Sequence, residues 1–173
     1  MIRLVPFSNA AGWAVLTRLD LDDALEAAAY DGHPVDAFTL LRDWQTGHAA
    51  AQLSQVACTS AGTPFALILV APTGQAGVSQ AALLSRDHRQ FGPHLARLAV
   101  LIRDGIDAWA EQVGVRRIEA RSHADHPRAD RLLRFCGFHL EARLPGFGAS
   151  GDEMFHQYAW LSEGVRHVQT AQD

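Results

Sequence analysis

Four titratable side chains in the second half of the sequence are suited to acid–base chemistry. His123, Asp125 and His126 follow a short segment predicted as a strand, and Glu141 lies in the next predicted strand. A histidine near its ordinary pKa takes up or releases a proton at neutral pH, so these residues are candidate catalytic groups. Asp125 and His126 also stand where a helix is expected to begin, and capping of that helix explains them without catalysis.

A metal site is not expected from the pattern of histidines and cysteines. His123 and His126 are three residues apart across a predicted strand-to-helix turn, and no second ligand pair has a recognised spacing. Cys58 and Cys136 are far apart in the sequence and show neither metal-ligand nor redox spacing. We therefore expect two buried thiols and no metal.

The segment that holds the candidate catalytic groups predicts the order strand, helix, strand, loop, strand. The expected elements are a strand at 116–122, a helix at 127–137, strands at 138–144 and 154–161, and a glycine-rich loop at 145–151. Pro127 suits a first helical turn, where its missing N–H costs nothing, and Gly137 suits a helix end. Alternation of apolar and polar residues indicates the first strand.

The preceding part of the chain is expected to supply four more strands and four helices. The expected strands are 2–6, 50–59, 64–71 and 78–85, and the expected shorter helices are 8–19, 20–30 and 35–44, with Gly47 closing the last. A long helix follows, because apolar residues recur at three and four positions between Leu95 and Val113. We expect Gly114 to end it, and Leu98, Ile102, Trp109, Leu132 and Phe138 to be buried.

The segment A-x-R-L-L-R-F-C-G-F at 129–138, followed by a strand with Glu141 and by Gly151-Asp152, resembles the C-terminal half of the GNAT (GCN5-related) acyltransferase fold. The first half of the chain is similar in the order of its elements. The resemblance implies an α/β (α+β) fold, a mixed and mostly antiparallel sheet flanked by helices. The length of 173 residues indicates a single domain, expected at 1–161 with a polar tail at 162–173. It also implies that the strand at 78–85 splays from the strand at 116–122 and opens a V-shaped cleft.

The same resemblance implies acetyl-CoA as co-substrate, with its pyrophosphate on backbone N–H groups at the start of the long helix, where a helix presents unpaired donors. The residues implied to hold it are Leu84, Ser85, Arg89, Gln90, Phe91, Gly92, His94 and Leu95. Arg89 and Gly92 match the family signature Q/R-x-x-G-x-G/A. Pro93, expected as the first helical residue, removes one donor, and His94 replaces a small residue. Retained and lost cofactor binding are both open.

The catalytic positions also differ from the family pattern. Leu133 stands where many members have a tyrosine that protonates the departing thiolate, and His126 stands where an asparagine is common. His123, Asp125, His126 and Glu141 are the candidate substitutes. Scattered positions (Asp20, Glu26 and Gly32, then Gly62-x-Pro64-x-Ala66) resemble a divergent GNAT-like group encoded by tailed bacteriophages, some of whose members are virion components.

Composition limits the partners that the chain is expected to have. The 173 residues carry a net charge of −4 with a pI near 6.1, which argues against nucleic acid as a generic partner. No apolar run approaches a membrane span and no signal-peptide pattern begins the sequence, so a cytoplasmic protein, or a virion component assembled there, is expected. Two functions remain: an N-acetyltransferase that uses acetyl-CoA and an amine, or a catalytically silent GNAT-fold protein that binds protein partners in an assembly.

Overall fold

The computed structural model describes residues 1–165, and these form a seven-stranded sheet with five helices. The strands are β1 (Ile2–Pro6), β2 (Leu53–Thr59), β3 (Pro64–Pro72), β4 (Val78–Ser85), β5 (Arg117–His123), β6 (His139–Phe147) and β7 (Glu153–Leu161). The helices are α1 (Asn9–Leu16), α2 (Leu21–Asp31), α3 (Ala37–Ala50), α4 (His88–Val113) and α5 (Ala129–Phe135). Most of the expected tail lies outside the described residues.

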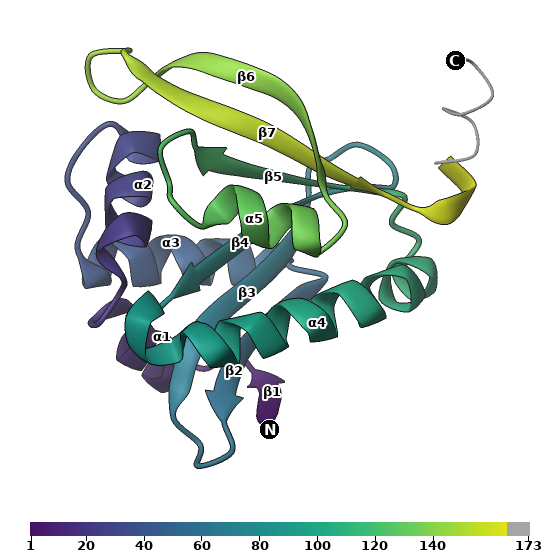
Figure 1. Ribbon diagram of the computed structural model, residues 1–173, viewed down its shortest axis with the longest axis horizontal. Helices are drawn as coiled ribbons and strands as arrows, with labels where there is room; N and C mark the ends of the chain where they lie inside the picture. Colours follow the sequence, from purple (N-terminus) through teal and green to yellow (C-terminus); the bar gives the residue numbers. More distant parts are fainter. Residues whose placement is uncertain (166–173) are drawn as a thin grey trace.

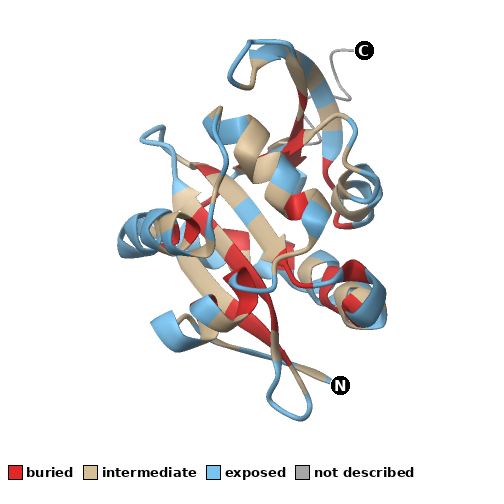
Figure 2. Ribbon diagram, turned by 90° about the vertical axis from the view of Figure 1, so that its left-hand side faces the viewer, coloured by how far each residue is buried: buried red, intermediate tan, exposed pale blue. Residues whose placement is uncertain are grey.

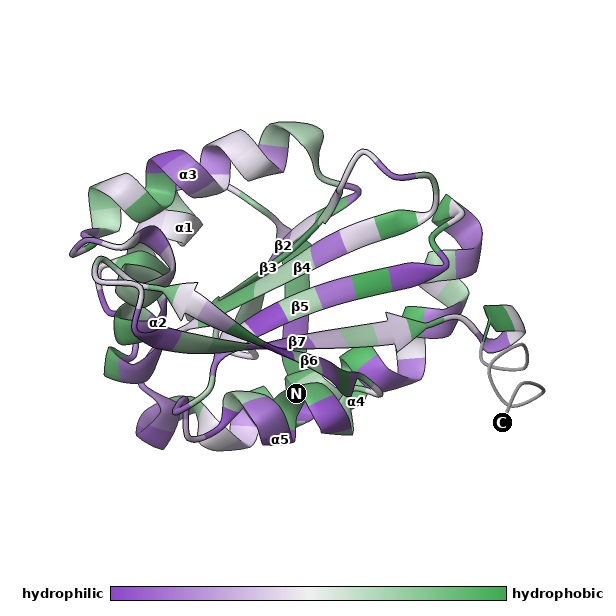
Figure 3. Cartoon of the chain, turned by 90° about the horizontal axis from the view of Figure 1, so that it is seen from above, coloured by the Kyte–Doolittle hydropathy of each residue, from purple (hydrophilic) through white to green (hydrophobic). Residues whose placement is uncertain are grey.

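The strand order is β1-β2-β3-β4-β5-β7-β6, and every neighbouring pair is antiparallel except β4 and β5. Helices α1 and α3 lie on one side of the sheet and α4 and α5 on the other (Figures 1 and 3). The predicted fold class, a mixed and mostly antiparallel sheet flanked by helices, is confirmed. No helix in the described part of the chain is both long and apolar enough to span a bilayer.

The two parallel strands separate soon after they meet. β4 and β5 pair over three residues only, Val78–Gln80 with Arg117–Glu119. Beyond these pairs β4 continues to Ser85 and β5 to His123. The structure therefore contains the predicted splay. We call the segments of β4 and β5 that do not pair with each other the β4 arm and the β5 arm, and the space between them the V.

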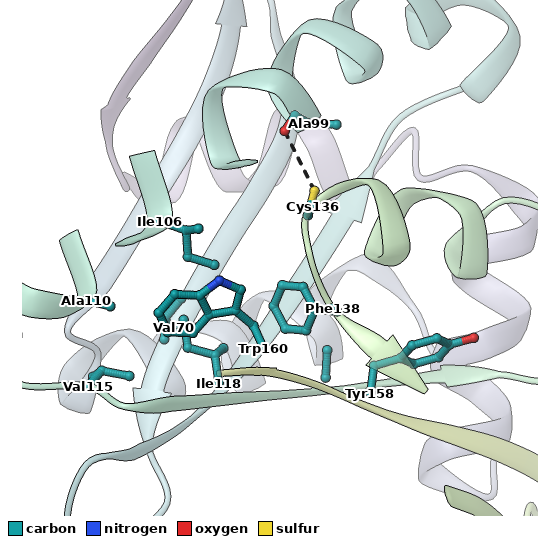
Figure 4. Packing of buried hydrophobic residues seen from close by; sticks show 11 residues of the cluster. Val70, Ala99, Ile106, Ala110, Val115, Ile118, Cys136, Phe138, Tyr158 and Trp160 are labelled. Carbon is teal, nitrogen blue, oxygen red and sulfur yellow. Dashed lines mark hydrogen bonds between the residues drawn. The ribbon is translucent and has the colours of Figure 1, made fainter. Parts of the chain in front are cut away.

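The core consists of apolar side chains between the sheet and the helices, where the buried residues concentrate (Figure 2). The cluster around Trp160 joins α4, α5 and strands β3, β5 and β7, and Cys136 lies within it with its thiol directed at the carbonyl of Ala99 (Figure 4). Of the predicted core, Leu98 and Phe138 are buried. Ile102, Trp109 and Leu132 are partly buried and pack against the same core.

Two predicted helix boundaries are wrong for physical reasons. Helix α3 runs through Gly47, whose missing side chain lets the helix approach the strand below: a Cβ there would lie 2.8 Å from a methyl group of Leu69. Helix α4 begins at His88, so Pro93 lies inside it instead of starting it. Asp87 accepts hydrogen bonds from the N–H groups of Arg89 and Gln90 and fixes this earlier start.

Candidate functional site

One face of α2 and its N-cap carries three carboxylates at a spacing of three residues, and each accepts a hydrogen bond from a backbone N–H outside the helix. Side chains at this spacing lie on the same side of a helix. The bonds join Asp20 to the N–H of His88 (2.6 Å), Asp23 to that of Ser85 (2.7 Å) and Glu26 to that of His123 (2.8 Å). Since Ser85 ends β4, His88 begins α4 and His123 ends β5, α2 lies across the open end of the V (Figure 1).

Asp23 is the centre of a buried polar cluster. Its carboxylate accepts hydrogen bonds from the N–H and the hydroxyl of Ser85, at 2.7 and 3.2 Å. The Nε2 atoms of His88 and His126 each lie 3.1 Å from its Oδ1. Burial, the largest influence, disfavours the charged carboxylate, but the hydrogen bonds with His126, His88 and the N–H of Ser85 and the charge of His88 together lower the pKa of Asp23. The cluster therefore holds an ionised carboxylate with several donors.

His126 caps α5 as well as contacting Asp23. Its Nδ1 accepts hydrogen bonds from the N–H groups of Arg128 (3.3 Å) and Ala129 (3.0 Å), so this nitrogen carries no proton. In the neutral ring the proton is then on Nε2, which donates to Asp23. This pattern gives His126 the role of a cap at the position where the resemblance places an asparagine, and it joins α5 to α2.

The same proton assignment bears on metal binding. Asp23, His88 and His126 present ligand-type atoms within 4.8 Å of one another. A metal on Nε2 of His126 would require the proton to sit on Nδ1, where the ring accepts two backbone N–H groups. A second group, Asp20, Asp22 and His88, lies at the starts of α2 and α4, whose positive ends disfavour a cation. Both groups suit hydrogen bonding better than a metal.

Glu26 is a side chain of the site whose pKa lies well above that of an ordinary glutamate. Burial raises the pKa of its carboxyl from an ordinary 4.5 to about 6, against the lowering effect of the hydrogen bond from the N–H of His123. The remaining neighbours are His126, Asp23 and the His123 ring, which act on it through their charges. A carboxylate of this kind is a stronger base than an exposed glutamate.

The structure separates the four predicted catalytic residues. His123 and His126 lie at the mouth of the V, and Nε2 of His123 donates a hydrogen bond to the Glu153 carboxylate at 2.6 Å. The side chain of Asp125 is exposed, and its backbone N–H donates to Nδ1 of His123 at 3.2 Å. Glu141 lies on β6, separated from β5 by β7, and forms an ion pair with Arg117. The pair lowers the pKa of Glu141.

Of the predicted cofactor-binding residues, Leu84 and Ser85 end β4, and those from Arg89 to Leu95 lie inside α4. The rings of Phe91 and Phe65 stack at 5.7 Å, and the His94 ring packs against both. Leu84 and Leu95 pack against the core on opposite sides of the sheet. Gly92 leaves free space, since a Cβ there would meet no atom within 4 Å.

The donors that an acyl-CoA would use are already occupied in this conformation. At the start of α4, the carboxylate of Asp87 accepts hydrogen bonds from the N–H groups of Arg89 and Gln90, and the carboxylate of Asp20 accepts one from the N–H group of His88. Asp23 takes the N–H of Ser85 on the β4 arm. Carboxylates there exclude a pyrophosphate by occupying its donors and by repelling its charge. An acyl-CoA would therefore compete with these carboxylates for the donors of the cleft.

Sequence reasoning missed the residues that organise this site. Asp23, Asp87 and His88 were not singled out, and Asp20 and Glu26 entered only through a family resemblance. A usable signal was present, because Asp20, Asp23 and Glu26 repeat every three residues on a predicted helix. The pattern indicates an acidic helix face, but it does not say which backbone groups that face contacts.

Comparison with known proteins identifies the fold. No family model and no curated protein matches the sequence. Among solved structures, ribosomal-protein-S18-alanine N-acetyltransferase from Escherichia coli matches with a TM-score of 0.63 and 15% identity, over 94% of this chain and 95% of that chain. Spermidine N-acetyltransferase from Vibrio cholerae in complex with CoA and spermine gives 0.69 and 14%, over 93% and 95%. An acetyltransferase of the GNAT family from Streptococcus pneumoniae gives 0.65 and 13%, over 94% and 99%. With its strand order and its splayed β4 and β5, the chain has the GNAT fold.

Proposed function

We propose that this protein is an acyl-CoA-dependent N-acetyltransferase that acts on a cationic amine. The observation that carries the proposal is Glu26, a half-buried carboxylate with a pKa raised to about 6, which accepts the N–H of His123 at the mouth of the V between β4 and β5. An ammonium must lose a proton before its nitrogen can attack a carbonyl. Glu26 is ionised at neutral pH and would accept that proton as general base.

The charge around Glu26 supports a cationic acceptor. Asp20, Asp22 and Asp23 lie on the same helix start, and Glu153 adjoins His123 at the end of β5. Such an acidic mouth favours a positively charged amine over a neutral or anionic substrate. The spermidine N-acetyltransferase with a similar fold was solved with spermine, a polyamine, which makes polyamines a rational first set of acceptors.

The test is acetyl-CoA-dependent acetylation of a panel of amines, including spermine, spermidine and a peptide with a free N-terminal alanine. We expect Glu26→Gln to lower turnover about 10²- to 10⁴-fold, the range for loss of a general base. Glu111→Gln, which removes the same charge from an exposed position on α4, should keep wild-type turnover. Equal activity of Glu26→Gln and wild type would remove Glu26 from the mechanism, and no product with any amine would refute the proposed function.

A second candidate function has its own observation in its favour. Because Asp20, Asp23 and Asp87 occupy the donors of the cleft, the chain is also suited to a catalytically silent role, as a GNAT-fold component that binds protein partners in an assembly such as a virion. A ligand at 100 times its Kd stabilises a fold by about 2.7 kcal/mol. The silent role predicts no thermal shift with millimolar acetyl-CoA, whereas the enzyme predicts a clear one.

A further inference from the structure

We propose that Asp20 and Asp23 form a latch that holds the acyl-CoA cleft closed, so that acyl-CoA binds only when these two side chains leave the β4 arm. The inference rests on the proposed function, because it takes the V as the acyl-CoA site. The GNAT fold implies a cleft that binds acyl-CoA, yet carboxylates of this chain already accept the N–H groups that line the cleft. The inference follows from this disagreement. We call Asp20 and Asp23 the latch below.

Four hydrogen bonds join the residues of the latch to Ser85 at the end of the β4 arm and to His88 at the start of α4. The carboxylate of Asp20 accepts the N–H of His88, and its own N–H donates to the carbonyl of Ser85 at 2.9 Å. The carboxylate of Asp23 accepts both the N–H and the hydroxyl of Ser85. Both hydrogen-bonding groups of Ser85 on this edge are thus in use, and Ser85 itself is fully buried. A ligand cannot form backbone hydrogen bonds with Ser85 while the latch is in place.

The contacts of α2 with the β5 arm are separate from the latch contacts with β4. Glu26 accepts the N–H of His123, and Asp23 bonds the His126 ring that caps α5. Asp23 is therefore the one side chain among these that bridges the two arms. When the latch releases Ser85 and His88, Glu26 keeps α2 attached to the β5 arm and stays at the mouth of the cleft.

The chemistry of the latch matches that of the ligand it excludes. Backbone N–H groups at a strand edge and at a helix start bind carboxylates and phosphates by the same hydrogen bonds and the same dipole attraction. The two carboxylates act as intramolecular anions that compete with the acyl-CoA. Removing one of them lowers the competition and should raise affinity for acetyl-CoA.

The experiment measures the Kd for acetyl-CoA by calorimetry in wild type, Asp23→Asn, Asp20→Ala and Asp22→Asn. Asparagine has only one acceptor oxygen, so in Asp23→Asn an NH2 group replaces the oxygen that faces either Ser85 or the two histidines. Two donors then face each other, and the bridge between the arms is broken. Asp20→Ala frees the N–H of His88 and also removes the N-cap of α2. Asp22→Asn changes the charge of α2 by the same amount as Asp23→Asn without touching the β4 arm, and it is the matched control.

We expect Asp23→Asn and Asp20→Ala to bind acetyl-CoA at least about tenfold more tightly than wild type, the scale of one hydrogen bond to a charged group. Asp22→Asn should change the Kd by less than about threefold, because Asp22 has the same charge but its carboxylate is not joined to Ser85 or His88 by any hydrogen bond in the described part of the chain. In hydrogen exchange without ligand, the amides of Ser85 and His88 should exchange faster in Asp23→Asn than in Asp22→Asn.

The outcomes separate the latch from the proposed function. Folded Asp23→Asn and Asp20→Ala that bind acetyl-CoA no more tightly than wild type would overturn the latch and leave the proposed function standing. Tighter binding in Asp22→Asn equal to that in Asp23→Asn would also overturn it, because charge alone would then explain the effect. If none of the four folded proteins binds acetyl-CoA, the proposed function fails and the latch fails with it.

Discussion

Glu26→Gln should stabilise the protein at high pH and leave its stability unchanged at low pH. Burial raises the pKa of the folded Glu26 carboxyl to about 6, whereas the unfolded chain keeps the ordinary value of 4.5. For an acid whose folded pKa is raised, the cost of ionisation is absent below the unfolded pKa and complete above the folded pKa. The cost therefore grows between about pH 4.5 and pH 6 and stays constant above it.

The pKa difference sets the size of the effect. A rise from 4.5 to about 6 corresponds to about 2 kcal/mol of destabilisation above pH 6. Glutamine has no charge to bury, and its carbonyl oxygen can still accept the N–H of His123. For a domain of this length, about 2 kcal/mol is a rise in Tm of roughly 4–8 °C.

The measurement is urea denaturation of Glu26→Gln and wild type, followed by tryptophan fluorescence at about pH 8 and about pH 4. The variant should unfold at higher urea at pH 8, and the two curves should coincide at pH 4. Glu111→Gln serves as the control for loss of one exposed negative charge. A Glu26→Gln protein less stable than wild type at pH 8 would refute the reasoning, because it would mean that the charged carboxylate is favourably placed.

Three further substitutions test the packing and the caps of the site by denaturation. Leu98→Ala should cost about 2–5 kcal/mol, because the side chain is 1% exposed and its removal leaves a cavity. Val100→Ala, on the exposed side of the same helix, should cost far less. His126→Ala should cost about 1–3 kcal/mol through the lost cap of α5 and the lost donor to Asp23, with most of the stability restored in His126→Asn. Asp87→Ala should cost about 0.5–2 kcal/mol as an N-cap loss at α4, and a loss near zero would mean that Asp87 does not fix the start of this helix.

The sequence alone was sufficient for most of the elements and for the fold class. The apolar repeat of α4 and the glycine at position 114 are local signals, because helix period and a left-handed C-terminal residue depend on neighbours in the chain. The separation of β4 from β5 followed from the family resemblance of the segment 129–138. Gly92 and Pro93 locally favour a helix that begins only at this point. In the structure α4 already begins at His88, because Asp87 caps it and Phe91 stacks on Phe65.

The state of the cleft could be decided only by the tertiary structure. The three-residue spacing of Asp20, Asp23 and Glu26 is visible in the sequence, but their backbone partners lie 68, 62 and 97 residues away. A hydrogen bond over such a distance depends on where the sheet brings the ends of β4 and β5, which no local pattern encodes. The raised pKa of Glu26 has the same origin, because its largest cause is burial in the folded protein, to which the charge of Asp23 adds.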